Sequence, residues 1–121
     1  MGKKINSRAK GAAGERELSS WLRSKGIKAR RGQQFSGGVE SPDIVADLPA
    51  WHIECKRVES LALYDALEQA KRDCSKRASN LPKHERLTPV VFHRKNNKEW
   101  VAVLRAEDFI ELVRPPSALL D

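Results

Sequence analysis

The sequence has no run of apolar residues long enough to cross a membrane, which excludes an integral membrane protein. Its first four residues, Met-Gly-Lys-Lys, are not followed by the apolar stretch of a secretory signal peptide. We therefore expect a cytoplasmic protein with no membrane partner.

Cysteine and histidine are scarce, with two and three residues respectively. Neither residue type forms a CxxC or HxxxH pattern, so the spacing does not indicate a zinc site. Cys55 and Cys74 each stand where an apolar residue is expected. We interpret both as buried thiols, and the histidines as surface or sheet-lining residues.

Aromatic residues make up only 6% of the chain, whereas 32% of the residues are charged. A hydrophobic content of 40% is still enough for a core, so we expect a small core inside a heavily charged shell. At 121 residues the chain is too short for two ordinary domains, and it contains no internal repeat or linker. The sequence predicts a single domain over residues 1–121, with a basic N-terminal arm at 1–10 and a tail at 114–121.

Positive charge is abundant, with 23 Lys and Arg residues against 16 Asp and Glu residues and a formal net charge of +7. A basic protein of this kind favours an acidic partner, either nucleic acid or an anionic membrane surface. Acidic side chains gathered on such a protein would repel phosphate unless a cation lay between them.

The hydrophobic pattern predicts three helices and five strands, bounded by glycine, proline and asparagine. In chain order these are a helix at 11–25, strands at 27–34, 43–46 and 51–56, a helix at 61–78, strands at 88–93 and 99–104, and a helix at 106–113. This order predicts an α/β fold in which a mixed sheet of about five strands is flanked by helices. The short connection at 47–50 is expected to form a hairpin.

Glu15 is unusual in the first helix because it lies three residues before Leu18 and seven before Leu22. That spacing puts its carboxylate on the apolar stripe, where it would need a metal ion or a basic partner. The alternative is a glutamate near the helix start that favours the helix dipole and points to water. Position alone does not separate the two interpretations.

Three further residues can form an acidic site with a lysine beside it. Glu54 and Lys56 are two residues apart on one strand, so they project from the same face. Asp43 begins the adjacent strand, and Pro42 keeps its approach extended. Two carboxylates on neighbouring strands can share a Mg²⁺ ion in phosphodiester hydrolysis. The alternative for Glu54 and Lys56 is a salt bridge on an exposed sheet.

The combination of Pro42-Asp43 with Glu54-Cys55-Lys56 resembles the PD-(D/E)xK nuclease superfamily. More narrowly, the run Lys10-Gly-Ala-Ala-Gly-Glu-Arg-Glu-Leu18 and the later Gly26, Arg31, Ser36-Gly-Gly38 and Pro-Asp-Ile-Val-Ala46 resemble archaeal-type Holliday-junction resolvases and their phage relatives. The resemblance covers roughly residues 8–70, and it implies a restriction-endonuclease-like core. If a phage encodes the chain, the expected location is the cytoplasm of its host cell.

The resemblance implies a role for each site residue. Asp43 and Glu54 would bind Mg²⁺, for which Mn²⁺ would substitute, together with the backbone carbonyl of Cys55. Lys56 would assist the attacking water, and Glu15 would complete the acidic site directly or through water. Gln69 falls where some related nucleases place a supporting helix glutamine, although an ordinary solvent-facing residue is an equal alternative.

Basic residues flank the proposed site on both sides in the sequence. They would follow DNA phosphates, or they would form an ordinary solvated surface. Arg16 and Arg31 match family positions that contact DNA, and the loop between Arg31 and Asp43 is longer than in archaeal relatives. The expected DNA contacts are Arg8, Lys10, Arg16, Lys28, Arg30, Arg31, Ser36, Gly37 and Gly38.

The sequence therefore predicts a metal-dependent endonuclease that cuts symmetric strands of a four-way DNA junction. A homodimer suits that substrate, because two equivalent sites can address strands related by a two-fold axis. No small-molecule cofactor is expected. The alternatives are another PD-(D/E)xK endonuclease or nickase, and a catalytically inactive basic module that binds DNA.

Overall fold

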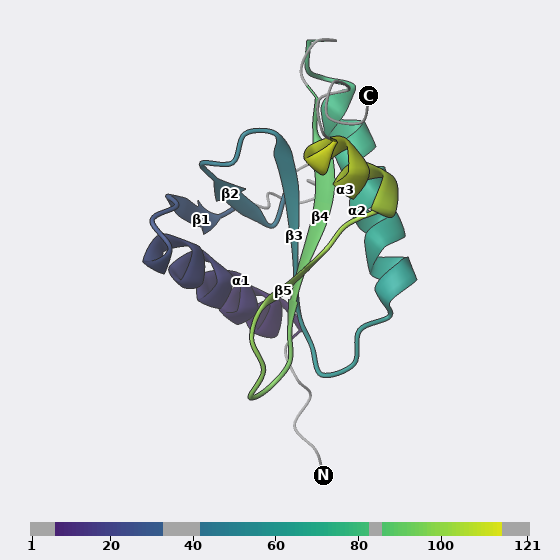
Figure 1. Ribbon diagram of the computed structural model, residues 1–121. Helices are drawn as coiled ribbons and strands as arrows, with labels where there is room; N and C mark the ends of the chain where they lie inside the picture. The colour runs from purple at the N-terminus through teal and green to yellow at the C-terminus, as the bar shows by residue number, and fades with distance from the viewer. Residues whose placement is uncertain (1–6, 33–41, 83–85, 115–121) are drawn as a thin grey trace.

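The computed structural model describes residues 7–32, 42–82 and 86–114, which form a five-stranded β-sheet and three helices (Figure 1). In chain order the elements are α1 (Ser7–Ser24), β1 (Ala29–Arg31), β2 (Ile44–Ala46), β3 (Trp51–Arg57), α2 (Leu63–Ala78), β4 (Thr88–Arg94), β5 (Val101–Val103) and α3 (Ala106–Val113). The expected mixed sheet flanked by helices is confirmed. No helix in these described ranges is both long and apolar enough to cross a membrane.

The strands lie in the order β1-β2-β3-β4-β5. The pairs β1–β2, β2–β3 and β4–β5 are antiparallel, and the expected hairpin between β2 and β3 is present. β3 and β4 run parallel, with Glu54 opposite Val91 in the register. A parallel pair needs a crossover connection, and α2 supplies it. With two strands on each side of it, β3 is the central strand of the sheet.

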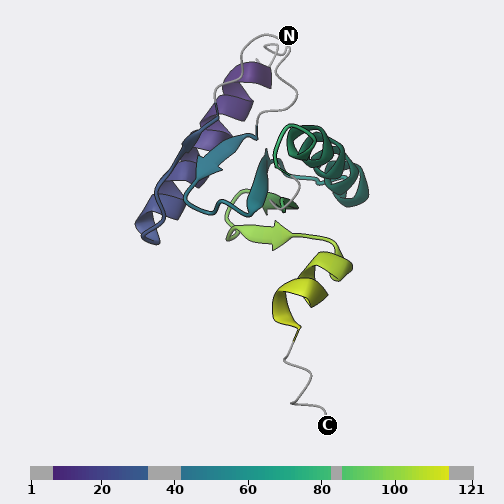
Figure 2. The ribbon, with the colours of Figure 1, turned by 90° about the horizontal axis from the view of Figure 1, so that it is seen from above.

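Helices α1 and α2 cover opposite faces of β3, as the view from above shows (Figure 2). The larger core lies under α1, where Leu18 and Leu22 are one helical turn apart and face the sheet. The other buried members of this core are Ile44, Ile53, Val90 and Trp100. Ile53 of β3 faces α1, and side chains alternate along a strand, so the even-numbered residues of β3 face α2.

The core under α2 is smaller and is built from small side chains. Ala66 and Ala70 pack against Val91, and Cys74 is buried one turn further along the helix. Small residues let the helix approach the sheet closely. Leu63 has the spacing of the apolar stripe of this helix, yet it is 41% exposed. Leu63 is the first residue of the helix, and the buried face begins at Ala66.

Several element boundaries differ from those expected. α1 begins at Ser7, so residues 7–10 are helical and not part of an arm, because this stretch contains no helix breaker. Of the strand expected at 27–34, β1 covers Ala29–Arg31, and residues 33 and 34 lie outside the described part of the chain. Gly26 ends α1 with φ +86°, and Asn97 has φ 64° in the turn between β4 and β5, both as the turn chemistry predicts. The expected tail lies almost wholly outside the described residues.

Candidate active site

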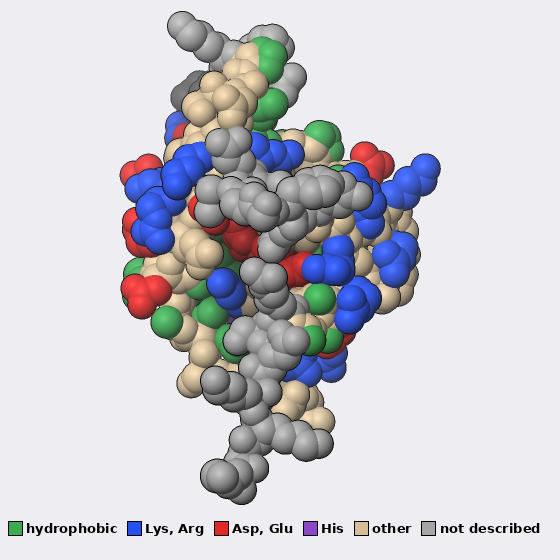
Figure 3. Space-filling view, turned by 180° about the vertical axis from the view of Figure 1, so that it is seen from behind, with side chains coloured by type: hydrophobic (Ala, Val, Ile, Leu, Met, Phe, Trp, Pro, Cys, Tyr) green, Lys and Arg blue, Asp and Glu red, His purple; other side chains and the backbone are tan. Residues whose placement is uncertain are grey.

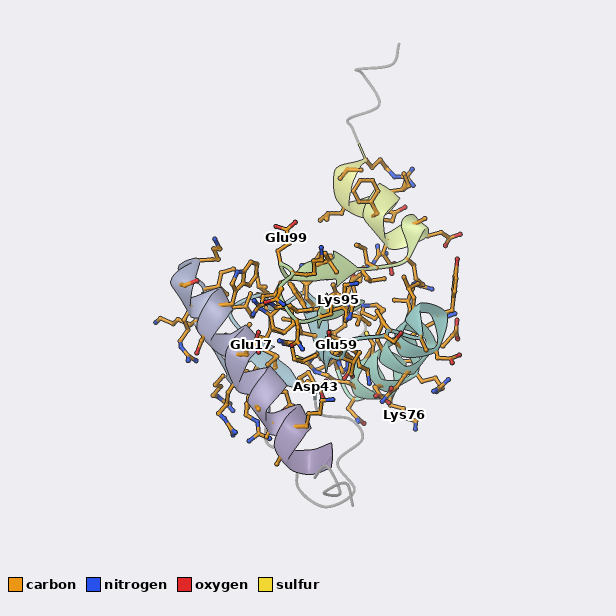
Figure 4. All side chains as sticks on the ribbon, turned by 90° about the horizontal axis from the view of Figure 1, so that it is seen from below. Glu17, Asp43, Glu59, Lys76, Lys95 and Glu99 are labelled. Atoms are coloured by element: carbon orange, nitrogen blue, oxygen red, sulfur yellow. The ribbon has the colours of Figure 1, made fainter. Side chains whose placement is uncertain are left out.

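Asp43 and Glu54 are brought together by the hairpin of β2 and β3. The backbone N–H of Asp43 donates to the carbonyl of Ile53 at 3.1 Å. In the other direction, the N–H of Cys55 donates to Oδ2 of Asp43 at 2.8 Å. These two bonds fix the aspartate beside β3, where its carboxyl group is hydrogen-bonded to that of Glu54. The view from below places Asp43 between α1 and α2 (Figure 4).

The two carboxyl groups resist ionisation at neutral pH. The pKa of each group is raised to about 7, and burial is the main cause. The negative charge of Glu54 contributes to the rise in the pKa of Asp43. A divalent cation would remove this repulsion, and carboxylate oxygens are the ligands that Mg²⁺ prefers. The donor set therefore fits the expected ion.

Lys56 lies on the same face of β3 as Glu54. Its positive charge lowers the pKa of both Asp43 and Glu54, against the effect of burial. The ammonium Nζ donates to Oε1 of Gln69 on α2 at 3.2 Å. Gln69 is thus in contact with a predicted site residue.

Glu15 is buried on α1, with 8% of its surface exposed. The pKa of Glu15 is raised by burial, and the nearby charge of Asp43 raises it further. Nε of Arg31 donates to its Oε1 at 3.0 Å. Of the two interpretations of Glu15, a carboxylate on the buried stripe with a basic partner is confirmed. Arg31, expected at the DNA, is the residue that balances it.

Three residues of this region were missed by the sequence analysis, namely His52, Asp73 and Arg77. His52 has none of its surface exposed, and its Nε2 lies 2.9 Å from Oε1 of Glu54. Arg77 approaches the other ring nitrogen, Nδ1, with Nη1 at 3.4 Å. Asp73 lies close enough to Glu54 to hydrogen-bond it and to raise its pKa.

His52 is neutral at physiological pH. Burial is the main cause, and the positive charge of Arg77 also contributes to lowering the pKa of His52 to about 4. An arginine can only donate, so Nδ1 must accept and the single ring proton must lie on Nε2. His52 consequently donates to Glu54. The only signal in the sequence is weak: His52 lies two positions before Glu54 on its strand, and Asp73 and Arg77 are four residues apart on the following helix.

The two cysteines are free thiols. Burial is the main cause that raises the pKa of Cys55 to about 12, and burial also raises that of Cys74. A thiolate nucleophile is therefore disfavoured at either position. In residues 7–32, 42–82 and 86–114, no three His, Cys, Asp or Glu side chains form a metal-binding group.

Acidic side chains gather near the middle of one face of the molecule, with Lys and Arg side chains on either side of them (Figure 3). Four predicted DNA contacts, Lys10, Arg16, Lys28 and Arg30, are exposed. A fifth, Arg31, is partly exposed and paired with Glu15. Ser36, Gly37, Gly38 and the side chain of Arg8 lie outside the described residues.

A mixed sheet with a helix on each face, with Glu54 and Lys56 on its central strand and Asp43 beside them, defines a nuclease of the restriction-endonuclease-like fold. The family model described as archaeal Holliday junction resolvase (Hjc) matches residues 6–111. The chain therefore belongs to this family, and the resemblance seen in the sequence is confirmed.

A solved structure supports the same assignment. The chain is similar to Hjc of Archaeoglobus fulgidus, a Holliday junction resolvase from an archaeal hyperthermophile. The two are 25% identical, with a TM-score of 0.51, and the match covers 74% of this chain and 72% of the other. No curated protein matches the sequence.

Proposed function

We propose that this member of the resolvase family hydrolyses phosphodiester bonds in four-way DNA junctions, with Mg²⁺ held by Asp43 and Glu54. The observation that supports the proposal most strongly is the buried pair of carboxyl groups, whose pKa values are both raised to about 7. Such a pair is unfavourable in an otherwise basic protein unless it serves a cation.

The ion supplies two things when bound, a water of lowered pKa and a positive charge against the phosphate oxygens. Besides the two carboxylates, the backbone carbonyl of Cys55, water and DNA phosphate are the proposed ligands. Mn²⁺ is expected to substitute for Mg²⁺. Glu15, held by Arg31, contributes negative charge at the edge of the site, directly or through a water.

Lys56 is the proposed partner of the attacking water and of the charge that develops on the phosphate. Its ammonium is directed by Gln69, which accepts one of its three N–H groups and leaves two for water or phosphate. The exposed Lys10, Arg16, Lys28 and Arg30 are proposed to contact the DNA backbone. Recognition of the junction would then depend on shape and phosphate positions.

A homodimer is proposed as the active form, because a four-way junction has strands related by two-fold symmetry. Helix α3 offers a surface for it. Four of its eight residues are large apolar side chains that are at least half exposed, namely Phe109, Ile110, Leu112 and Val113.

We also propose that the protein acts in the cytoplasm.

Cleavage of a four-way junction and of a linear duplex of matched sequence tests the proposal. Wild-type protein and Asp43→Asn are each assayed with Mg²⁺, with Mn²⁺ and with EDTA. We expect the wild type to cut the junction with either metal ion and not to cut it in EDTA. Asp43→Asn should not cut it under any of the three conditions. Equal cutting of both substrates would rule out junction selectivity, and cutting by the variant would rule out the metal assignment. Binding without cutting in either metal would favour an inactive DNA-binding module.

A further inference from the structure

Helix α2 and strand β3 meet along a row of polar contacts on the face of the sheet that carries Glu54. Side chains on one face of a strand recur about every 7 Å, and residues four apart on a helix recur about every 6 Å. Two neighbouring elements can therefore match polar groups one to one. The pairs are Lys56 with Gln69, Glu54 with Asp73, and His52 with Arg77.

His52 is the innermost member of this row. Its ring has no exposed surface, and each of its nitrogens faces a polar partner from a different element. Burying an imidazole costs free energy that an aliphatic residue of similar size would not. What the imidazole adds is a directed N–H, and that N–H ends on Oε1 of Glu54 at 2.9 Å.

Arg77 determines which way the ring is polarised. Its Nη1 donates to Nδ1, so the ring proton is confined to Nε2 and faces the glutamate. Asp73 approaches the same carboxylate from α2 with a like charge. The Nε2–H of His52 is thus the donor that offsets this repulsion and fixes one oxygen of Glu54.

We propose that His52 and Arg77 are positioning residues of the metal site, through which Glu54 is held in the orientation that binds the ion. Arg77 fixes the tautomer of His52, and His52 fixes the carboxylate. Partners of this kind behind a ligand typically change metal affinity by about 10- to 100-fold. The inference depends on the proposed function, since it needs Glu54 to be a metal ligand.

Four variants test it. His52→Leu removes the donor at similar volume, and His52→Gln keeps an N–H in the same region. Arg77→Met removes the group that fixes the tautomer. Lys76→Met is the matched control. Lys76 is exposed and lies next to Arg77 on the same helix, and its substitution removes the same charge.

The affinity for Mn²⁺ is measured by calorimetry without DNA, and the Mg²⁺ concentration for half-maximal junction cleavage is measured separately. Thermal unfolding in EDTA reports on folding. We expect His52→Leu to weaken Mn²⁺ binding and to raise the half-maximal Mg²⁺ concentration, each by about tenfold. Arg77→Met should shift both in the same direction by less, His52→Gln should recover most of the affinity, and Lys76→Met should match the wild type.

Two failures are distinguishable. If the wild type binds no Mn²⁺, the metal assignment itself fails. If the wild type binds Mn²⁺ and folded His52→Leu binds it equally well, His52 has only a structural role and the inference is overturned. Should His52→Leu not fold, Arg77→Met decides, because unchanged Mn²⁺ affinity in that variant overturns the inference and weakened affinity supports it.

Discussion

The chemistry of this protein is concentrated in a few carboxyl groups that the fold holds in unfavourable surroundings. Asp43 and Glu54 are hydrogen-bonded to each other within the protein, and burial is the main cause that raises both pKa values to about 7. The charge of Glu54 also raises the pKa of Asp43, and the charge of Asp73 also raises that of Glu54. The cost of ionising such a pair is recovered when a cation binds. Loss of either charge should therefore affect stability and catalysis in opposite directions.

Asp43→Asn should stabilise the metal-free protein above neutral pH. The pKa of Asp43 is raised from 3.8 to about 7, so the folded wild type loses stability as the pH rises from about 4 to about 7. The neutral amide avoids this loss. We expect a gain on the order of 2 kcal/mol in the free energy of unfolding at pH 8 in EDTA, shrinking toward zero near pH 4. Urea denaturation across this pH range measures it.

Mg²⁺ provides the control for that prediction. It should raise the melting temperature of the wild type at pH 8 and leave Asp43→Asn nearly unchanged, because binding stabilises only a protein that keeps the ligand. Equal stability of the two proteins at pH 8 without metal would contradict the raised pKa of Asp43 in the folded protein.

The residue pattern was sufficient to predict that Asp43, Glu54, Lys56 and Glu15 lie near one another. It could not reveal His52, Asp73 or Arg77, because their contacts depend on the register between α2 and β3. Twenty-five positions separate His52 from Arg77 in the chain. Nothing in a single sequence fixes how far along the strand the helix lies.

At the level of elements, α1 approaches β3 closely at Gly14. A Cβ at this position would lie 2.6 Å from the Cβ of Arg57, which is closer than two side chains can pack. Glu17, one turn further on, accepts hydrogen bonds from Arg57 and from Arg94 on β4. The glycine and this ion pair together set the distance between the helix and the sheet, and with it the position of Glu15.

Gly14→Ala should destabilise the protein by about 1–3 kcal/mol, because the added methyl group forces α1 away from the sheet. Gly11→Ala is the matched control in the same helix. Among the described residues, a Cβ at Gly11 would meet only the Glu15 carboxylate, at 3.9 Å. That variant should gain about 0.5–1 kcal/mol from helix propensity. Thermal and urea unfolding measure both, and similar effects of the two substitutions would contradict the close approach.

The existence and order of the elements were predictable, because periodicity of apolar residues marks each of them. Their boundaries were less so. The stretch 27–34 alternates like a strand, yet β1 covers only Ala29–Arg31 because its partner β2 has only three residues to pair with it. Leu63 fits the apolar period of α2, but a helix terminus need not meet the sheet.

At the scale of the whole molecule, the exposed apolar side chains of α3 are the feature that a single chain leaves unexplained. Val101 on the preceding strand β5 is also exposed, at 46%. An apolar surface of this kind favours association, and a resolvase that cuts two strands needs two sites.

Phe109→Glu should convert a homodimer to a monomer, because the charge would be buried at the interface. Light scattering coupled to size exclusion measures the mass. Glu107→Gln, on the same helix, is the control and should remain dimeric. We expect the monomeric variant to lose coordinated cutting of two junction strands, and to leave nicked products. A wild type that is itself monomeric, or a dimeric Phe109→Glu, would exclude α3 as the interface.

The proposed role of the buried acidic pair in metal-dependent cleavage of junctions can be tested on Glu54. The measurement is the single-turnover rate at which Glu54→Gln cuts a bound four-way junction at saturating Mg²⁺. We predict a rate about a thousandfold below the wild type, equivalent to about 4 kcal/mol of transition-state stabilisation, with unchanged junction affinity in EDTA. A rate within a few-fold of the wild type would contradict the claim.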